Sequence, residues 1–182
     1  MKFLDVVVVA AIATSGCKSA GGQPLSPPGR TLSALTVTSA TFASGGAIPV
    51  DFTCDGADRS PQLTLSAPPQ GTRSLAIMVD DPDAPGGVFT HWIAYNLKPD
   101  TLAVPEGADP ALLGGLSGTN DFKGLGYAGP CPPKFEAHHY RFQILALDSL
   151  LAPRSPATRE DFLAALSGHL LGEGTLVGVY SR

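Results

Sequence analysis

Short apolar runs, separated by Pro- and Gly-rich stretches, dominate the chain, and most of them have the length of a β-strand. Residues Leu35–Ser39 alternate apolar and polar positions, which predicts a strand with one buried face. Ser74–Val79 is an uninterrupted apolar run, as in a strand buried on both faces. Further extended segments are predicted at Ala47–Thr53, Leu63–Leu65, Phe89–Leu97, Tyr140–Leu147 and Leu176–Tyr180.

One helix is predicted late in the chain. Thr158 and Asp161 match a capping box, in which a hydroxyl and an acid three residues apart satisfy N–H groups of the first turn. The expected apolar stripe is Phe162, Leu166 and Leu170, and the glycines expected to end the helix are Gly172 and Gly174. Many short strands with one late helix predict a mostly β domain, a β-sandwich with a peripheral helix.

The first 33 residues have a different character from the rest. A lysine, the apolar run Val6–Ala13 and small residues before Cys17 have the layout of a secretory signal peptide, too short for a membrane span. We expect a signal peptide over residues 1–16 and a lipid-modified Cys17, as in bacterial lipoproteins; ordinary secretion is the alternative. Residues 17–33 are rich in Gly, Pro and Ser, which predicts a flexible tether. The folded domain is expected over residues 34–182.

Composition narrows the class of protein. The chain has 182 residues, 12 Lys and Arg against 16 Asp and Glu, and only 15% charged residues. A mildly acidic chain without basic clusters argues against nucleic-acid binding. The 21 glycines and 17 prolines disfavour a long coiled coil.

Three cysteines fit an exported protein. With Cys17 assigned to the lipid, Cys54 and Cys131 remain, an even number in an oxidising compartment. We therefore predict a Cys54–Cys131 disulfide; two buried free thiols are the alternative. Neither cysteine belongs to a Cys-x-x-Cys or Cys/His cluster, so no metal site and no cofactor are predicted.

An acidic corner follows the apolar run at Ser74–Val79. Asp80, Asp81 and Asp83 lie within four positions, and prolines stiffen the turn. Carboxylates at the end of a buried strand must be solvated, protonated or paired. His91 lies inside the returning strand, and an antiparallel return would bring its imidazole back beside this corner. A solvated acidic turn and a histidine satisfied within the core are the alternatives.

The third cluster is the Pro-rich segment Gly129–Lys134, followed by His138, His139 and Tyr140. Imidazoles and a phenol at the start of a strand are suited to binding an anion. Cys131 with His138 is an alternative nucleophile and base, although their spacing is not specific for that. No P-loop, HExxH or GxSxG motif occurs.

Taken together, DPDAP, the strand histidine in HW, GPCPPK and HHYRF resemble the phosphatidylethanolamine-binding protein family, in particular its bacterial and archaeal Raf-kinase-inhibitor-like branch. The resemblance runs from about Leu35 to Arg182. It implies a β-sandwich of two antiparallel sheets with a small anion pocket at one end. The pocket residues it implies are Asp81, Asp83, Pro85, His91, Gly129, Pro133, His138 and Tyr140. Leu65 and Phe89 stand where the family often has Trp.

The expected function is that of an exported binding protein rather than an enzyme. The pocket would take a small anion such as phosphate or a phospholipid head group, with the aspartates orienting and charging the imidazoles. The protein would contact the membrane through its lipid anchor only, on the periplasmic or outer face, and bind no nucleic acid. A role as inhibitor or regulator of a partner protein is a further expectation. The alternative is a metal-assisted or acid/base hydrolase that uses the same Asp and His residues.

Overall fold

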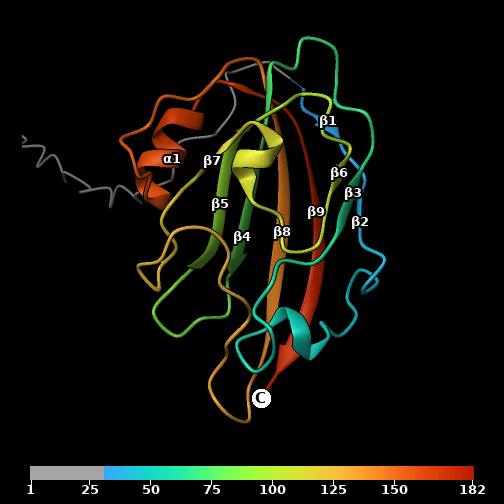
Figure 1. Cartoon of the computed structure of the whole chain (residues 1–182), viewed down its shortest axis with the longest axis vertical. Helices are drawn as coiled ribbons and strands as arrows, with labels where there is room; N and C mark the ends of the chain where they lie inside the picture. The colour runs from blue at the N-terminus through green and yellow to red at the C-terminus, as the bar shows by residue number, and fades with distance from the viewer. Residues whose placement is uncertain (1–30) are drawn as a thin grey trace, which may run out of the picture.

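The computed structural model describes residues 31–182, which form two β-sheets and one α-helix. The six-stranded sheet has the order β1-β9-β8-β4-β5-β7, and the three-stranded sheet has the order β2-β3-β6. Figure 1 shows α1 on one side of the large sheet and the small sheet on the other. The elements are β1 Ser33–Ala34, β2 Val37–Thr38, the 3-10 helix η1 Val50–Phe52, β3 Leu63–Leu65, β4 Ser74–Asp81, β5 Phe89–Leu97, β6 Ala103–Val104, the 3-10 helix η2 Pro110–Leu113, β7 Leu116–Ser117, β8 Ala137–Leu147, α1 Arg159–Leu166 and β9 Leu170–Ser181.

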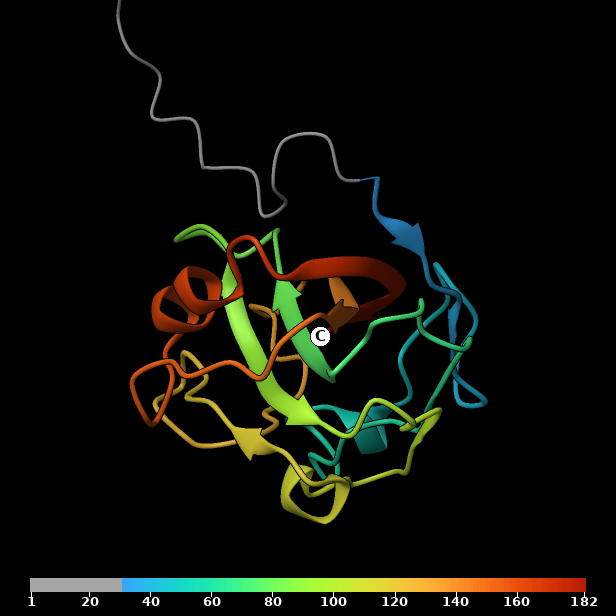
Figure 2. The ribbon, with the colours of Figure 1, turned by 90° about the horizontal axis from the view of Figure 1, so that it is seen from above.

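The apolar run at Ser74–Val79 forms β4, which lies in the large sheet between β8 and β5. Its side chains alternate between two cores, as the pleat of a strand requires. Ile77 and Val79 pack in the core between the two sheets, and Ala76 and Met78 pack in the core beneath α1. The view from above shows α1 as a layer beside the large sheet (Figure 2). The prediction of a mostly β fold with two sheets and a peripheral helix is confirmed.

The helix is shorter than predicted. Thr158 caps α1 through the capping box with Asp161, as expected, and Phe162 and Leu166 are buried. The predicted continuation to Leu170 is wrong, because Leu170 begins β9. Gly172 and Gly174 therefore lie within β9 and do not end the helix. A Cβ on Gly174 would lie 2.2 Å from the carbonyl oxygen of Leu35. The close approach of the β1 end of the chain therefore requires glycine there.

Two smaller predictions also differ from the structure. The segment Ala47–Thr53 is not a strand: it contains one isolated bridge at Ala47 and the 3-10 helix η1. The large sheet is not wholly antiparallel, since β1 pairs with β9 in parallel.

The signal peptide (residues 1–16), Cys17 and most of the tether (residues 17–33) lie outside the described residues. The described chain begins at Thr31 and enters β1 at Ser33, close to the predicted start of the domain. Within residues 31–182, no helix has the length and apolar content needed to cross a lipid bilayer.

Candidate functional site

The alternation of β4 sends its two terminal aspartates to opposite faces of the large sheet. Asp80 faces α1, where its fully buried carboxylate accepts two hydrogen bonds from Arg141 at 2.7 and 2.8 Å and one from Arg159 at 3.2 Å. Asp81 faces the other core and accepts from His138 Nδ1 at 2.7 Å. Asp80 therefore joins the helix to the sheet, and Asp81 belongs to the candidate site.

His91 reaches the face of Asp81 because the pairing of β4 with β5 is irregular. Val79 pairs with Trp92 and Asp80 pairs with Thr90, which leaves His91 as an extra residue on β5. An extra residue of this kind re-aims side chains at the end of a strand. The His91 ring lies 5.2 Å, centroid to centroid, from Tyr140 of β8. Residues far apart in sequence thus meet at one end of the sandwich.

These residues surround a cavity of about 330 Å³. Five of the predicted site residues line it: Asp81, Pro85, His91, Pro133 and His138. The residues that the sequence reasoning did not assign to it are Ala84, Phe89, Phe122, Cys131, Pro132 and Arg182. Phe122 comes from a stretch with little periodicity, so no pattern in the sequence marked it.

Three predicted residues are not among those that line the cavity. Asp83 accepts from the backbone N–H and Nδ1 of His139, at 2.8 and 2.7 Å. Gly129 donates to Asp58 at 2.6 Å, and a Cβ on it would lie 2.5 Å from the carbonyl oxygen of Phe52. Tyr140 is fully buried, and its hydroxyl has no hydrogen-bond partner among the described residues. Asp83 and Gly129 therefore hold the segments that carry the site.

A disulfide fixes one wall of the cavity. Cys54 and Cys131 are bonded, with their Cα atoms 5.5 Å apart, which confirms the predicted bridge. The Cys54 N–H also donates to the carbonyl oxygen of Pro130 at 3.1 Å. Since Cys131 lines the cavity, the Pro-rich segment is tied to the loop around η1. The bonded sulfur cannot act as a thiolate nucleophile, so the Cys131–His138 alternative does not hold in this state.

The pKa values of the two histidines of the cavity are shifted in opposite directions. Burial lowers the pKa of His91, and the Ala128 carbonyl and the charge of Asp81 offset this only in part. His91 Nδ1 lies 2.7 Å from that carbonyl oxygen, which can only accept. Nδ1 therefore carries the proton, and Nε2 of the neutral ring is an acceptor.

His138 has the opposite preference. Burial disfavours its charged form, but hydrogen bonds to Asp81 and Glu136 outweigh burial, and the pKa of His138 is raised. Its Nε2 lies 3.2 Å from Glu136 Oε2. The cavity thus combines a histidine whose surroundings favour the imidazolium with one whose surroundings favour the neutral imidazole. Among the described residues, no group of three or more His, Cys, Asp or Glu side chains is arranged to hold a metal ion.

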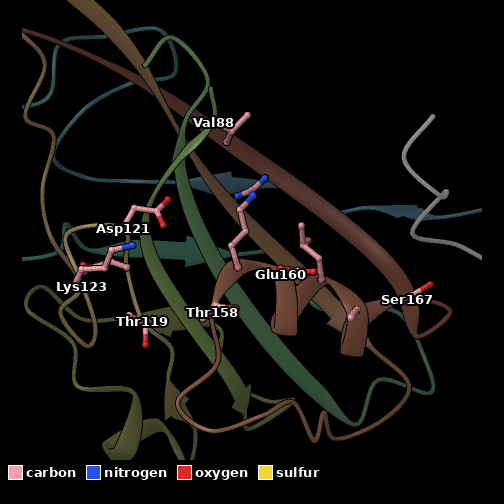
Figure 3. Close-up of a pocket in the computed structure, with 11 residues that line it drawn as sticks. Val88, Thr119, Asp121, Lys123, Thr158, Glu160 and Ser167 are labelled. Atoms are coloured by element: carbon pink, nitrogen blue, oxygen red, sulfur yellow. The ribbon is translucent and has the colours of Figure 1, made fainter. Parts of the chain in front are cut away.

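A larger hollow of about 1050 Å³ lies beside α1, on the other side of the 119–123 turn. Figure 3 shows Asp121 and Lys123 on one side of it and Glu160 of α1 on the other. Its charged lining is balanced, since Lys123 and Arg159 face Asp121 and Glu160. It contains none of the predicted site residues, so the smaller cavity is the candidate site.

Comparisons with known proteins agree with this fold. Residues 38–181 match the family model described as phosphatidylethanolamine-binding protein. A UPF0098 protein of Pyrococcus abyssi is 38% identical over all of this chain and 99% of its own length. A crystal structure of a phosphatidylethanolamine-binding protein homolog, CT736 of Chlamydia trachomatis, matches with a TM-score of 0.76 at 36% identity, over 82% of this chain and 98% of that one. A Mycobacterium tuberculosis protein named "Putative lipoprotein LppC" is 38% identical over 93% of this chain and 90% of its own.

Proposed function

The chain belongs to the phosphatidylethanolamine-binding protein family, and from that premise we propose that its 330 Å³ cavity binds a small anion. The class we propose is phosphate, a phosphate monoester such as a lipid head group, or a carboxylate. One observation carries the proposal: the charged His138 and the neutral His91 line the same cavity. Ligand cavities in proteins are about 300–1,000 Å³, so this one has room for a head group rather than a whole lipid.

Each cationic or polar group has a distinct part in this proposal. His138 Nε2 donates a charge-assisted hydrogen bond, which is about twice as strong as a neutral one. Arg182 lines the same cavity and adds a second positive charge. His91 Nε2 accepts from a protonated ligand oxygen, or takes up a proton when the anion binds. Asp81 does not touch the anion and instead keeps His138 charged and oriented.

We propose binding rather than catalysis. The residues that line the cavity include no Ser, Thr or Lys, and Cys131 is in a disulfide. An assay of phosphate-monoester hydrolysis, with and without EDTA, tests this point. Turnover that disappears in an Asp81→Asn variant would favour the hydrolase. A role as regulator of a partner protein stays a separate prediction. If a variant that no longer binds the anion kept its biological effect, that role would not depend on anion binding.

Replacing His91 with alanine is expected to weaken phosphate binding about tenfold to a hundredfold, the value of one charge-assisted hydrogen bond. Calorimetry with inorganic phosphate and with phosphoethanolamine measures this loss. The pH dependence is diagnostic. Because the pKa of free His91 is lowered and a bound anion favours the protonated ring, the affinity of the wild type should rise as pH falls towards and below about 6.5. Sulfate is the probe for this measurement, because its own charge is constant in that range.

His169→Ala is the matched control. The helix predicted to continue to Leu170 would contain His169, but His169 lies after the end of α1, and its Nδ1 pairs with Asp148 at 2.8 Å. His169 directly precedes Leu170, the first residue of β9, whereas His138 pairs with Tyr180 near the last residue of that strand. The two histidines therefore lie at opposite ends of β9. This variant should bind phosphate like the wild type. Equal affinity of the His91 and His169 variants would overturn the proposed site.

We further propose that the protein is exported and anchored by a lipid on Cys17. The LppC relative carries lipoprotein in its name, and the leader of this chain has the matching layout. Cys17→Ser is expected to move the protein from the membrane fraction to the soluble fraction, and to abolish incorporation of a labelled fatty acid. Wild-type protein that never takes up the label would indicate ordinary secretion.

The point where the tether joins the domain and the cavity lie at different ends of the large sheet. Ser33 of β1 pairs with Gly172 at the start of β9, and Ala137, beside the cavity, pairs with Ser181 at its end. At roughly 3.3 Å per residue these points are about 30 Å apart, and Figure 1 shows β1 at the opposite end of the large sheet from the C-terminus. The cavity would then open at the end of the domain distant from the point where the tether joins.

A further inference from the structure

The cations of the cavity already have carboxylate partners within this chain. The His138 imidazolium contacts Asp81 through Nδ1 at 2.7 Å and Glu136 through Nε2 at 3.2 Å. Arg182 Nη2 lies 2.9 Å from Asp55 Oδ1. With His91 neutral, these groups carry two positive and three negative charges. An external anion therefore meets a cavity whose positive charge is compensated, and one carboxylate must give way to it.

Asp81 and Asp55 are held by further contacts. The Asp81 side chain is only 5% exposed, and it also accepts from the Asp83 N–H at 2.8 Å. Asp55 accepts from the Tyr180 hydroxyl at 2.8 Å as well as pairing with Arg182. Moving either one would break several interactions. Neither carboxylate is suited to exchange with a ligand.

Glu136 differs from both. Its side chain is 53% exposed, and the 3.2 Å contact with His138 is its only polar contact among the described residues. Its backbone is fixed on both sides: its N–H donates to Pro133 at 3.3 Å, and its carbonyl oxygen accepts from the Arg182 N–H at 3.4 Å. A rotation of the side chain is therefore enough to release His138 Nε2, with the cavity wall left in place.

We propose that Glu136 is a built-in competitor for the anion, a carboxylate that occupies the position at His138 Nε2 that the ligand must take. This inference rests on the proposed function, and it sets an affinity threshold that every anion at His138 has to exceed. An incoming anion exchanges for a carboxylate already present, and the effective concentration of a tethered group is high. An anion that reaches only His138, such as acetate or chloride, gains little from the exchange. An oxyanion with a protonated oxygen, such as a phosphate monoester, can contact His138 and His91 together and is favoured.

Glu136→Gln tests this role. The amide keeps the size of the side chain and removes its negative charge, so the competition weakens and the repulsion of the ligand disappears. Phosphate is expected to bind about tenfold tighter than to the wild type, by calorimetry at pH 6, where His138 is charged. Acetate should gain at least as much, so the preference for phosphate over acetate should not increase. In histidine NMR titrations, the pKa of His138 should fall in this variant because one of its two carboxylate partners is gone.

Glu173→Gln is the matched control, because it removes the same charge from an exposed position on β9, at the other end of the large sheet. Phosphate affinity and the pKa of His138 should both be unchanged there. An unchanged or weaker affinity in Glu136→Gln, with the wild type still binding phosphate, would overturn the competitor role and leave the anion site standing. If neither the wild type nor Glu136→Gln binds phosphate, the anion site itself is wrong, and the competitor role falls with it.

Discussion

Replacing both Cys54 and Cys131 with serine is expected to lower the free energy of unfolding by about 4–5 kcal/mol. The bridge joins residues 77 apart in sequence, and the chain-entropy estimate for closing a loop of that length gives this value. Urea unfolding of the oxidised wild type and of the double variant measures the difference. The reduced wild type should resemble the double variant.

Loss of the bridge should also weaken phosphate binding. Cys131 lines the cavity together with Pro132 and Pro133, and Arg182 Nη1 lies 3.5 Å from its sulfur. Without the covalent tie, the ordering of this wall must come from the binding energy. Cys17→Ser is the control, since it removes a cysteine that is not part of the bridge. A double variant as stable as the Cys17 variant would contradict the structural role of the disulfide.

Asp81→Asn is expected to cost about 3 kcal/mol of stability near pH 6. The Asp81–His138 pair is almost completely buried, with side chains 5% and 4% exposed, and removal of Asp81 leaves the buried imidazolium with only the exposed Glu136 as a carboxylate partner. The raised pKa of His138 sets the pH dependence. The stabilisation is complete below about 6.5, the ordinary value for histidine, and is lost as pH rises through the raised pKa. The cost of Asp81→Asn should therefore shrink between pH 6 and pH 9, as urea unfolding at both values would show.

Asp83→Asn is the control for this variant. Asp83 pairs with His139, but both side chains are about half exposed, and exposed pairs contribute about 0–1 kcal/mol. Anion binding should fall at least tenfold in Asp81→Asn, because His138 loses the partner that keeps it charged, and should fall by less in Asp83→Asn, since Asp83 does not line the cavity. Equal costs for the two variants, or a cost of Asp81→Asn that does not depend on pH, would contradict the assigned roles.

Local patterns were enough to predict most strands. The continuous apolar run at Ser74–Val79 predicted a strand buried on both faces, and β4 contributes to both cores. Thr158 and Asp161 placed the start of α1 correctly, because a capping box acts within a single turn. The end of the helix was missed because spacing alone cannot tell whether Leu170 continues a helix or begins a strand. The pairing of β9 with β8 decides that, and it is a contact across the fold.

The sequence by itself indicated which residue types the site would use, and the family resemblance implied that Asp81, His91 and His138 would meet at one end of the sandwich. Only the tertiary structure decided which contacts and which charge each of these residues has. The alternation of β4 sends Asp80 to the helix and Asp81 to the cavity, and the extra residue on β5 turns His91 towards Asp81. Burial lowers the pKa of His91, whereas hydrogen bonds to Asp81 and Glu136 raise the pKa of His138, and neither effect can be read from the order of residues. The physical reason is that strand register, burial and ion pairing arise from contacts between segments distant in the chain, whereas a sequence pattern reports only on neighbours along it.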